Sequence, residues 1–179
     1  PKDPPPPLDE NFDDAAALPN GWVSTGPSNG TDWEVGVPSG GGGLSSPPNA
    51  AVSAPNCAGT NIAGDYTGTT DVSLISPSFF VPANSGALLT FNQWADTVSG
   101  DSGSVRVLDA DNADTPIPGV EILDITGLGG FGDGWTFETL DLPSADVAGK
   151  NIKIEFRFQS DGSVNAGGFY VDDVVVILN

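Results

Sequence analysis

The sequence contains no histidine and a single cysteine, Cys57. Without histidine, the chain cannot form a Ser-His-Asp or Cys-His catalytic apparatus or a histidine-ligated zinc site. One cysteine excludes a disulfide framework and a cysteine-rich metal cluster within the chain, so we expect Cys57 to be a buried or incidental thiol. The only catalytic apparatus that these absences leave is a pair of carboxylates, as in glycosidases.

Basic residues are scarce as well, because five Lys and Arg residues stand against 24 Asp and Glu, for a formal net charge of −19. Nucleic acids and anionic membranes attract proteins through Lys and Arg, so we exclude both as partners. No apolar run reaches the roughly 18 residues of a membrane-spanning helix. The acidic excess has two compatible explanations: solubility in a salty extracellular medium, and oxygen ligands for hard cations. The composition fits a secreted protein of a marine or halophilic microbe.

Glycine and proline are abundant, with 24 and 16 residues, and both disrupt helix interiors. Nine short segments have strand-like patterns separated by turn-forming clusters, and only 13–18 and 144–150 are candidate helices of a turn or two. The 179 residues therefore predict one all-β domain, an antiparallel β-sandwich (jelly roll) of about nine or more strands with little or no helix. The predicted strands are residues 21–26, 32–37, 72–81, 87–94, 103–109, 119–126, 135–142, 151–159 and 169–178.

Residues 151–159 carry the clearest strand pattern. Their apolar side chains alternate with charged ones, which predicts a half-buried antiparallel strand with an exposed cross-strand ladder. The apolar face holds Ile152, Ile154, Phe156 and Phe158, and the charged face holds Lys153, Glu155 and Arg157.

The proline-rich start, PKDPPPPL at residues 1–8, is typical of a stiff linker that cannot join a sheet. We expect the folded domain to cover residues 9–179. A linker at this position also indicates that another domain precedes it in the parent chain.

Two acidic motifs resemble functional sites but have the wrong spacing. Glu121 and Asp124 in EILDIT are three residues apart, so a strand would put them on opposite faces and not in one glycosidase cleft. DADNAD at 109–114 has Ala113 where an EF-hand loop needs its third ligand. We expect an acidic hairpin tip there, with a weak surface cation site as the alternative. The sequence thus predicts that the chain is not an enzyme.

Three segments, taken in order, resemble bacterial MAM-like and cleaved-adhesin-like jelly-roll domains of secreted proteins. They are DENFDDAAALPNGW at 9–22, DVSLISPSFFVP at 71–82, and the stretch from GWTFETLDL to FYVDDVVV at 134–176. The resemblance implies a calcium-stabilised, non-catalytic β-sandwich appended to a secreted peptidase, adhesin or polysaccharide-degrading enzyme. Eukaryotic MAM domains carry cysteine pairs that this chain lacks, so the bacterial branch is the better match.

The acids at the two ends of the domain would form the calcium site that this resemblance implies. If the first and last strands pair, ENFDD lies across from VDD, and carboxylates from both ends converge on one Ca²⁺ with backbone carbonyls completing the shell. The alternative is an edge strand with both aspartates solvated. Which aspartate points inward is left open. The predicted ligands are Glu10, Asp13, Asp172 and Asp173.

Aromatic side chains are the candidate ligand-binding residues, because sugar sites use aromatic platforms beside polar groups. The candidates are Tyr66, Trp94, Phe131 and Trp135, each with core packing as the alternative, whereas Trp22 and Trp33 are expected in the core. The leading hypothesis is a polysaccharide-binding accessory module. The alternatives are an adhesin-type module for an extracellular protein and a passive spacer. We expect a secreted monomer, with cell-surface attachment as an option, joined to an upstream catalytic or surface domain.

Overall fold

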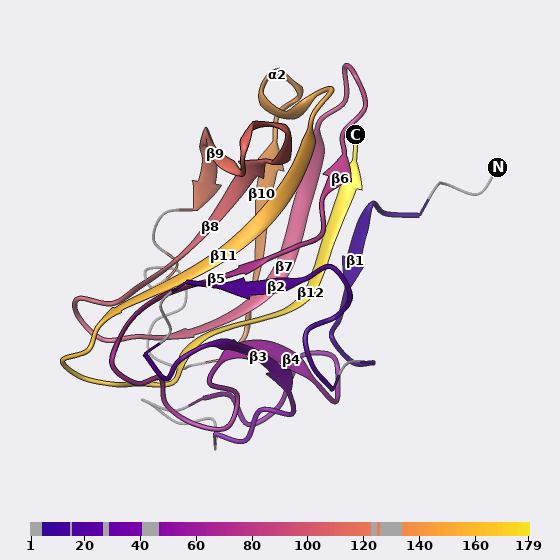
Figure 1. The fold of residues 1–179 in the computed structure, drawn as a ribbon. Coiled ribbons are helices and arrows are strands. Elements are labelled where there is room, and N and C mark those ends of the chain that lie inside the picture. Colours follow the sequence, from indigo (N-terminus) through magenta and orange to yellow (C-terminus); the bar gives the residue numbers. More distant parts are fainter. Residues whose placement is uncertain (1–4, 15, 27–28, 41–46, 123–124, 126–133) are drawn as a thin grey trace.

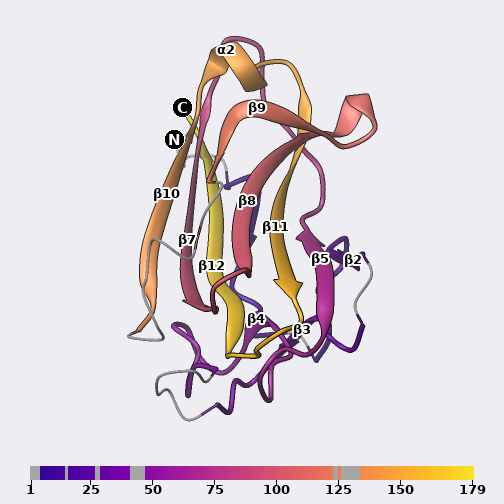
Figure 2. The same ribbon diagram turned by 90° about the vertical axis from the view of Figure 1, so that its left-hand side faces the viewer.

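The computed structural model describes residues 5–179 except 15, 27–28, 41–46, 123–124 and 126–133. In this part of the chain, two six-stranded sheets lie face to face, as the two views in Figures 1 and 2 show. The only α-helix among the described residues is the single turn α2, Ser144–Val147. The predicted antiparallel β-sandwich with little helix is therefore confirmed. No described helix is long and apolar enough to cross a membrane.

Sheet A contains the strand that carries the two adjacent aspartates. Its strand order is β10-β7-β12-β4-β3, and β1 also pairs with β12. The bounds are β1 Leu8–Glu10, β3 Trp33–Gly36, β4 Cys57–Thr60, β7 Ala87–Asp96, β10 Thr136–Leu142 and β12 Gly168–Leu178.

Sheet B is built around β11, the strand with the clearest alternation in the sequence. Its order is β2-β5-β11-β8-β9, and the short β6 also pairs with β11. A 3₁₀ turn, Ala110–Asn112, joins β8 to β9 and confirms the predicted acidic hairpin tip. The bounds are β2 Val23–Thr25, β5 Thr69–Ile75, β6 Phe79–Phe80, β8 Ser102–Asp109, β9 Thr115–Ile122 and β11 Asn151–Asp161.

Strand β12 lies in the interior of sheet A. It pairs with β7 along one edge, while β4 and β1 share the other edge, opposite Tyr170–Val171 and Val174–Val176 respectively. The first and last strands therefore pair as predicted (Figure 1). The alternative of an edge strand with two solvated aspartates is wrong, because Asp172 has no solvent exposure.

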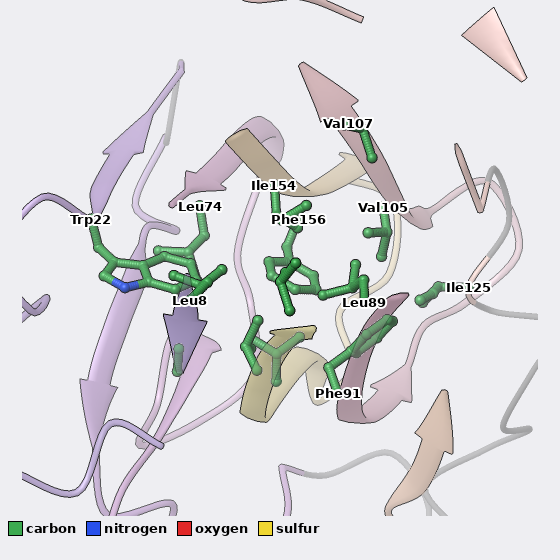
Figure 3. Close-up of a cluster of buried hydrophobic side chains, with 14 of the residues drawn as sticks. Leu8, Trp22, Leu74, Leu89, Phe91, Val105, Val107, Ile125, Ile154 and Phe156 are labelled. Atoms are coloured by element: carbon green, nitrogen blue, oxygen red, sulfur yellow. The ribbon is translucent and has the colours of Figure 1, made fainter. Parts of the chain in front are cut away.

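The hydrophobic core fills the space between the two sheets. Figure 3 shows that it combines β11 residues Ile154 and Phe156 with Leu89 and Phe91 of β7 and with Trp22 near β2. Phe91 and Phe156 meet edge to face with ring centroids 5.2 Å apart. Full burial of one such side chain contributes about 1.5–3 kcal/mol. The expected core positions of Trp22 and Trp33 are confirmed.

The outer face of sheet B carries the predicted charge ladder. Lys153 pairs with Asp114 at 2.8 Å, and Arg157 pairs with Asp71 at 2.6 Å. Arg106 on β8 lies directly opposite Glu155 and pairs with it at 2.5 Å. Glu155 is buried although it belongs to the outer face, because Arg106 and Ser73 cover its carboxylate.

Several element boundaries differ from the sequence-based expectation. The linker ends before Leu8, which joins β1 and packs in the core. The predicted strand at 72–81 is two strands, β5 and β6, interrupted at Pro77. The described residues of 13–18 form turns and bends instead of a helix, and β4 was not predicted at all.

Candidate functional site

Strand β12 contains a β-bulge at the two aspartates. Its pairing with β7 passes from Asp172 opposite Asn92 to Val175 opposite Thr90, so β12 has one extra residue there. The backbone of Asp173 takes the left-handed conformation, with φ of 50°. Before the bulge, Phe169 and Val171 face the core, and after it Val174 and Val176 do. Asp172 therefore points to the outer face of sheet A, on the same side as Tyr170.

Residues 50–56, which we call the covering segment, bury Asp172 from the outside. One carboxylate oxygen accepts the backbone N–H groups of Val52 and Ser53, both at 2.9 Å. The other accepts the Ser53 hydroxyl at 3.2 Å and the Asp173 N–H at 2.8 Å. Asp172 is thus the inward aspartate, but it lies under the covering segment and not between the sheets.

The electrostatic environment of Asp172 is unfavourable for a negative charge. Burial raises the pKa of its carboxyl group to about 6, and the neighbouring Asp173 adds to this effect. The backbone N–H groups of Ser53, Asp173 and Val52 oppose the shift because they stabilise the carboxylate. Asp173 is partly exposed and accepts a hydrogen bond from the Asn92 amide at 3.2 Å.

Glu10 ends the pairing of β1 with β12, opposite Val174, and Asp13 lies just beyond that pairing. Glu10 is half-buried, and its carboxylate accepts the Phe12 N–H at 2.7 Å. Burial raises the pKa of Glu10, and the negative charges of Asp9 and Asp14 raise it further. Asp13 accepts the Asn56 N–H at 3.2 Å, while the Asn56 amide donates to the Asp13 carbonyl at 3.1 Å. Acids from both chain ends therefore contact the covering segment.

Two of the four predicted ligands, Asp13 and Asp172, form hydrogen bonds with the covering segment. Asp172 accepts the N–H groups of Val52 and Ser53 in the middle of this segment, and Asp13 accepts the N–H group of Asn56 at its C-terminal end. Within the described part of the chain, no three His, Cys, Asp or Glu side chains are grouped so that they could hold a metal ion. The calcium ion stays a prediction.

Aromatic residues gather on the outer face of sheet A beside this site. Trp94 on β7 lies directly opposite Tyr170 on β12, and the two pack with Cys57 in a small buried cluster. Trp135 covers this cluster from outside, with its ring centroid 6.3 Å from that of Trp94 in an edge-to-face contact. Its indole N–H donates to the Ala50 carbonyl at 2.9 Å, and the side chain is partly exposed.

The other predicted platform residues have different surroundings. Tyr66 is fully buried, packs edge to face on Phe158 with centroids 4.8 Å apart, and donates its hydroxyl to Asp101. Its ring is therefore a core element, and burial raises its pKa. Trp94 is only 5% exposed and packs beneath Trp135, and its indole N–H has no hydrogen-bond partner among the described residues. Phe131 lies outside the described residues.

Cys57 is part of a buried cluster, and the acids of the β8–β9 hairpin form hydrogen bonds and ion pairs with neighbouring residues. Cys57 is buried as expected, and burial raises the pKa of its thiol. In the hairpin, Asp111 accepts the Asn151 N–H at 2.9 Å, Asp109 pairs with Lys150, and Asp114 pairs with Lys153. These contacts attach the hairpin to β11. Glu121 lies opposite Arg106, and Asp124 is outside the described residues.

Two features of this region were missed by reasoning from the sequence. The covering segment contains no strand or helix, and the roles of Ser53 and Asn56 depend on partners far away in the chain. Phe137 is the most exposed large hydrophobic side chain among those described, at 65%, and alternation with Trp135 would have placed it on the same face.

Comparison with known proteins shows that this β-sandwich architecture is shared with solved structures. No protein-family model matches the chain. The K1 cleaved adhesin domain of Lys-gingipain from Porphyromonas gingivalis W83 superimposes with a TM-score of 0.58 at 20% identity, covering 96% of this chain and 98% of that one. A structure of carbohydrate-binding modules from the β-sandwich superfamily gives a TM-score of 0.63 at 15% identity, covering 93% and 60%. The resemblance to cleaved-adhesin-like jelly-roll domains is therefore confirmed at the level of the fold.

One protein is similar in sequence as well. Over 164 residues, the chain is 34% identical to part of Bacillopeptidase F of Bacillus subtilis (strain 168). The match covers 91% of this chain, which spans about a tenth of the length of that protein.

Proposed function

We propose that the chain is a non-catalytic accessory module of a secreted bacterial protein and that it binds polysaccharide. The fold supports this proposal, since it is shared with a structure of carbohydrate-binding modules. The chain matches only a small part of Bacillopeptidase F, a peptidase by name. An accessory module attached to a larger protein would produce such a partial match. The whole sequence has no histidine, so this chain could not itself supply a histidine-dependent peptidase site.

The partly exposed, fixed ring of Trp135 is the observation on which the proposal rests. A sugar ring packs its C–H face on an aromatic side chain, and binding is stronger when that side chain needs no ordering. Trp135 is held in place by its hydrogen bond to Ala50 and by its contact with Trp94. It is therefore a preorganised platform on the outer face of sheet A, beside the covering segment.

Calcium is part of the proposal as a structural ion between the acids of the two chain ends. Carboxylate and carbonyl oxygens are the ligands that Ca²⁺ prefers. Burial raises the Glu10 pKa, and the negative charges of Asp9 and Asp14 raise it further. A bound cation would relieve this local excess of negative charge. Glu10, Asp13 and Asp173 remain the proposed ligands, whereas both carboxylate oxygens of Asp172 are already occupied by N–H and O–H donors. The ion would restrain the covering segment, and with it the Ala50 carbonyl that orients Trp135.

A panel of immobilised polysaccharides tests the proposal. Wild type should be retained by at least one polysaccharide, and Trp135→Ala should lose that retention while keeping the thermal unfolding of a folded protein. An adhesin-type module is the second candidate because of the likeness to the gingipain domain. No retention by any glycan, together with retention on an extracellular protein matrix, would replace the first candidate with the second.

A further inference from the structure

We propose that the ligand is an uncharged polysaccharide chain, and that it lies across the outer face of sheet A on a platform that extends from Trp135 to Phe137. This inference rests on the proposed function and specifies its ligand class and its site. The platform comprises Phe137 and Thr139 from β10, Trp135 immediately before that strand, and Asn92 and Thr90 from β7.

The pairing of β10 with β7 brings these side chains together. Phe137 lies directly opposite Asn92, and Thr139 lies directly opposite Thr90. Phe137 and Thr139 alternate along β10 and share its outer face, and the contact of Trp135 with Trp94 places Trp135 on the same face. In extended backbone, positions two residues apart are about 7 Å apart. That spacing is on the scale of one sugar residue. Two rings in a row therefore fit successive sugars of a chain better than a single monosaccharide.

The polar side chains around Phe137 suit hydroxyl groups. Asn92, Thr90 and Thr139 are partly or fully exposed, and each offers an amide or a hydroxyl that can donate and accept hydrogen bonds. The Asn92 amide is oriented by its bond to Asp173. An exposed aromatic ring flanked by oriented neutral polar groups can contact both the C–H face and the hydroxyl groups of a sugar.

The distribution of charge selects an uncharged ligand. The Lys and Arg residues of the described chain all lie on or next to strands of sheet B, and all are paired with carboxylates: Arg106, Lys150, Lys153 and Arg157. The fifth basic residue, Lys2, lies outside the described residues. A carboxylated or sulfated polysaccharide would thus find no free cation among the described residues of this face. It would also be repelled by a chain of net charge −19.

The same charge argues against a second copy of the chain as the occupant. Two surfaces from molecules of net charge −19 repel each other unless a large apolar area compensates. The platform has only one strongly exposed apolar side chain, Phe137, with threonine and asparagine beside it. A neutral, hydroxyl-rich chain carries no such repulsion.

Affinity electrophoresis and pull-down with two sets of probes test the inference. Xylan, a mixed-linkage β-glucan and a mannan are the uncharged probes, and polygalacturonate and alginate are the acidic ones. We expect wild type to bind an uncharged probe with little dependence on salt, and Phe137→Ala to weaken that binding about tenfold or more. The matched control is Phe80→Ala, which removes an aromatic side chain that is 53% exposed on sheet B. It should bind like wild type.

The outcomes separate this inference from the proposed function. Two outcomes overturn the inference but leave polysaccharide binding in place. The first is binding to the acidic probes only. The second is binding to an uncharged probe that is equally strong in Phe137→Ala and Phe80→Ala. No binding to either set overturns both. Self-association in sedimentation that Phe137→Ala abolishes, without glycan binding, would identify a second copy as the occupant. Thermal unfolding of Phe137→Ala should match wild type, because the ring is 65% exposed.

Discussion

The carboxylate of Asp172 accepts hydrogen bonds from both the backbone N–H and the hydroxyl of Ser53, a residue 119 positions earlier in the chain. With the N–H of Val52, these bonds fasten the covering segment to the centre of sheet A. The same segment supplies the carbonyl that orients Trp135. One buried acid on β12 is thus connected to the proposed binding face by a short, irregular piece of chain.

Asp172→Asn should destabilise the fold by about 2 kcal/mol. Each oxygen of Asp172 accepts two hydrogen bonds, so an amide NH₂ in either orientation replaces an acceptor with a donor that faces other donors. Urea unfolding followed by tryptophan fluorescence, in the presence of EGTA, measures the change. Asp173→Asn is the matched control and should stay within about 0.5 kcal/mol of wild type. Equal effects of the two variants would contradict the role given to Asp172.

Removal of calcium should lower the melting temperature by about 5–10 °C. The proposed ion would bind the folded chain only, so excess EGTA removes its stabilisation, and added Ca²⁺ should restore it better than Mg²⁺. Differential scanning calorimetry gives the measurement. Asp13→Asn and Asp173→Ala should melt at the same temperature with and without EGTA. A wild-type melting curve that EGTA leaves unchanged would remove calcium from the proposal.

Gly59→Ala should destabilise the fold by about 2–3 kcal/mol. Gly59 of β4 lies opposite Tyr170, and a methyl group there would come within 2.1 Å of the Tyr170 ring. The ring is fully buried and cannot move aside without disturbing Trp94 and Cys57. Gly64→Ala is the control, since nothing lies within 4 Å of the added carbon. Thermal unfolding compares the two variants directly. Similar melting temperatures would show that the cluster of Cys57, Trp94 and Tyr170 can rearrange around the added methyl group at little cost.

Most of the fold could be predicted from the sequence because its central strands carry strong local patterns. The alternation in β11 fixes which face is buried, and the ladder on its other face follows from the same period of two. Strand β4, CAGT, is buried on both faces and made of small residues, so it has no alternation to detect. Strand β1 has three residues and depends on its pairing with β12.

The site was harder to predict because its geometry depends on the bulge in β12. The core-facing Val171 and Val174 are three residues apart, which is the local sign of an extra residue. The run VVV at 174–176 hides this sign, since it fits either strand phase. In β10, the aromatic side chains face outward while Glu138 is on the inner side within 3.5 Å of Gln93. Hydrophobicity alone does not decide between the faces, because Leu140 and Leu142 on the inner side are apolar as well.

The Arg157–Asp71 pair on sheet B should make stability depend on acid pH. Arg157 donates to both oxygens of Asp71, at 2.7 and 2.6 Å, and these bonds hold the pKa of Asp71 below its ordinary value of 3.8. Because the folded-state pKa is the lower one, the stabilisation is fully present above the ordinary value. It is lost as the pH falls through the folded-state pKa.

Asp71→Asn should therefore cost about 0.5–1 kcal/mol near neutral pH, a modest amount because the pair is partly exposed. Toward pH 3 and below, the difference between the variant and wild type should shrink. Urea unfolding at a series of pH values, from about 7 down to about 2.5, follows this difference. Asp141→Asn, on the exposed side of β10, is the control for a general loss of negative charge. If both variants change stability alike at every pH, the bidentate pair contributes nothing beyond net charge.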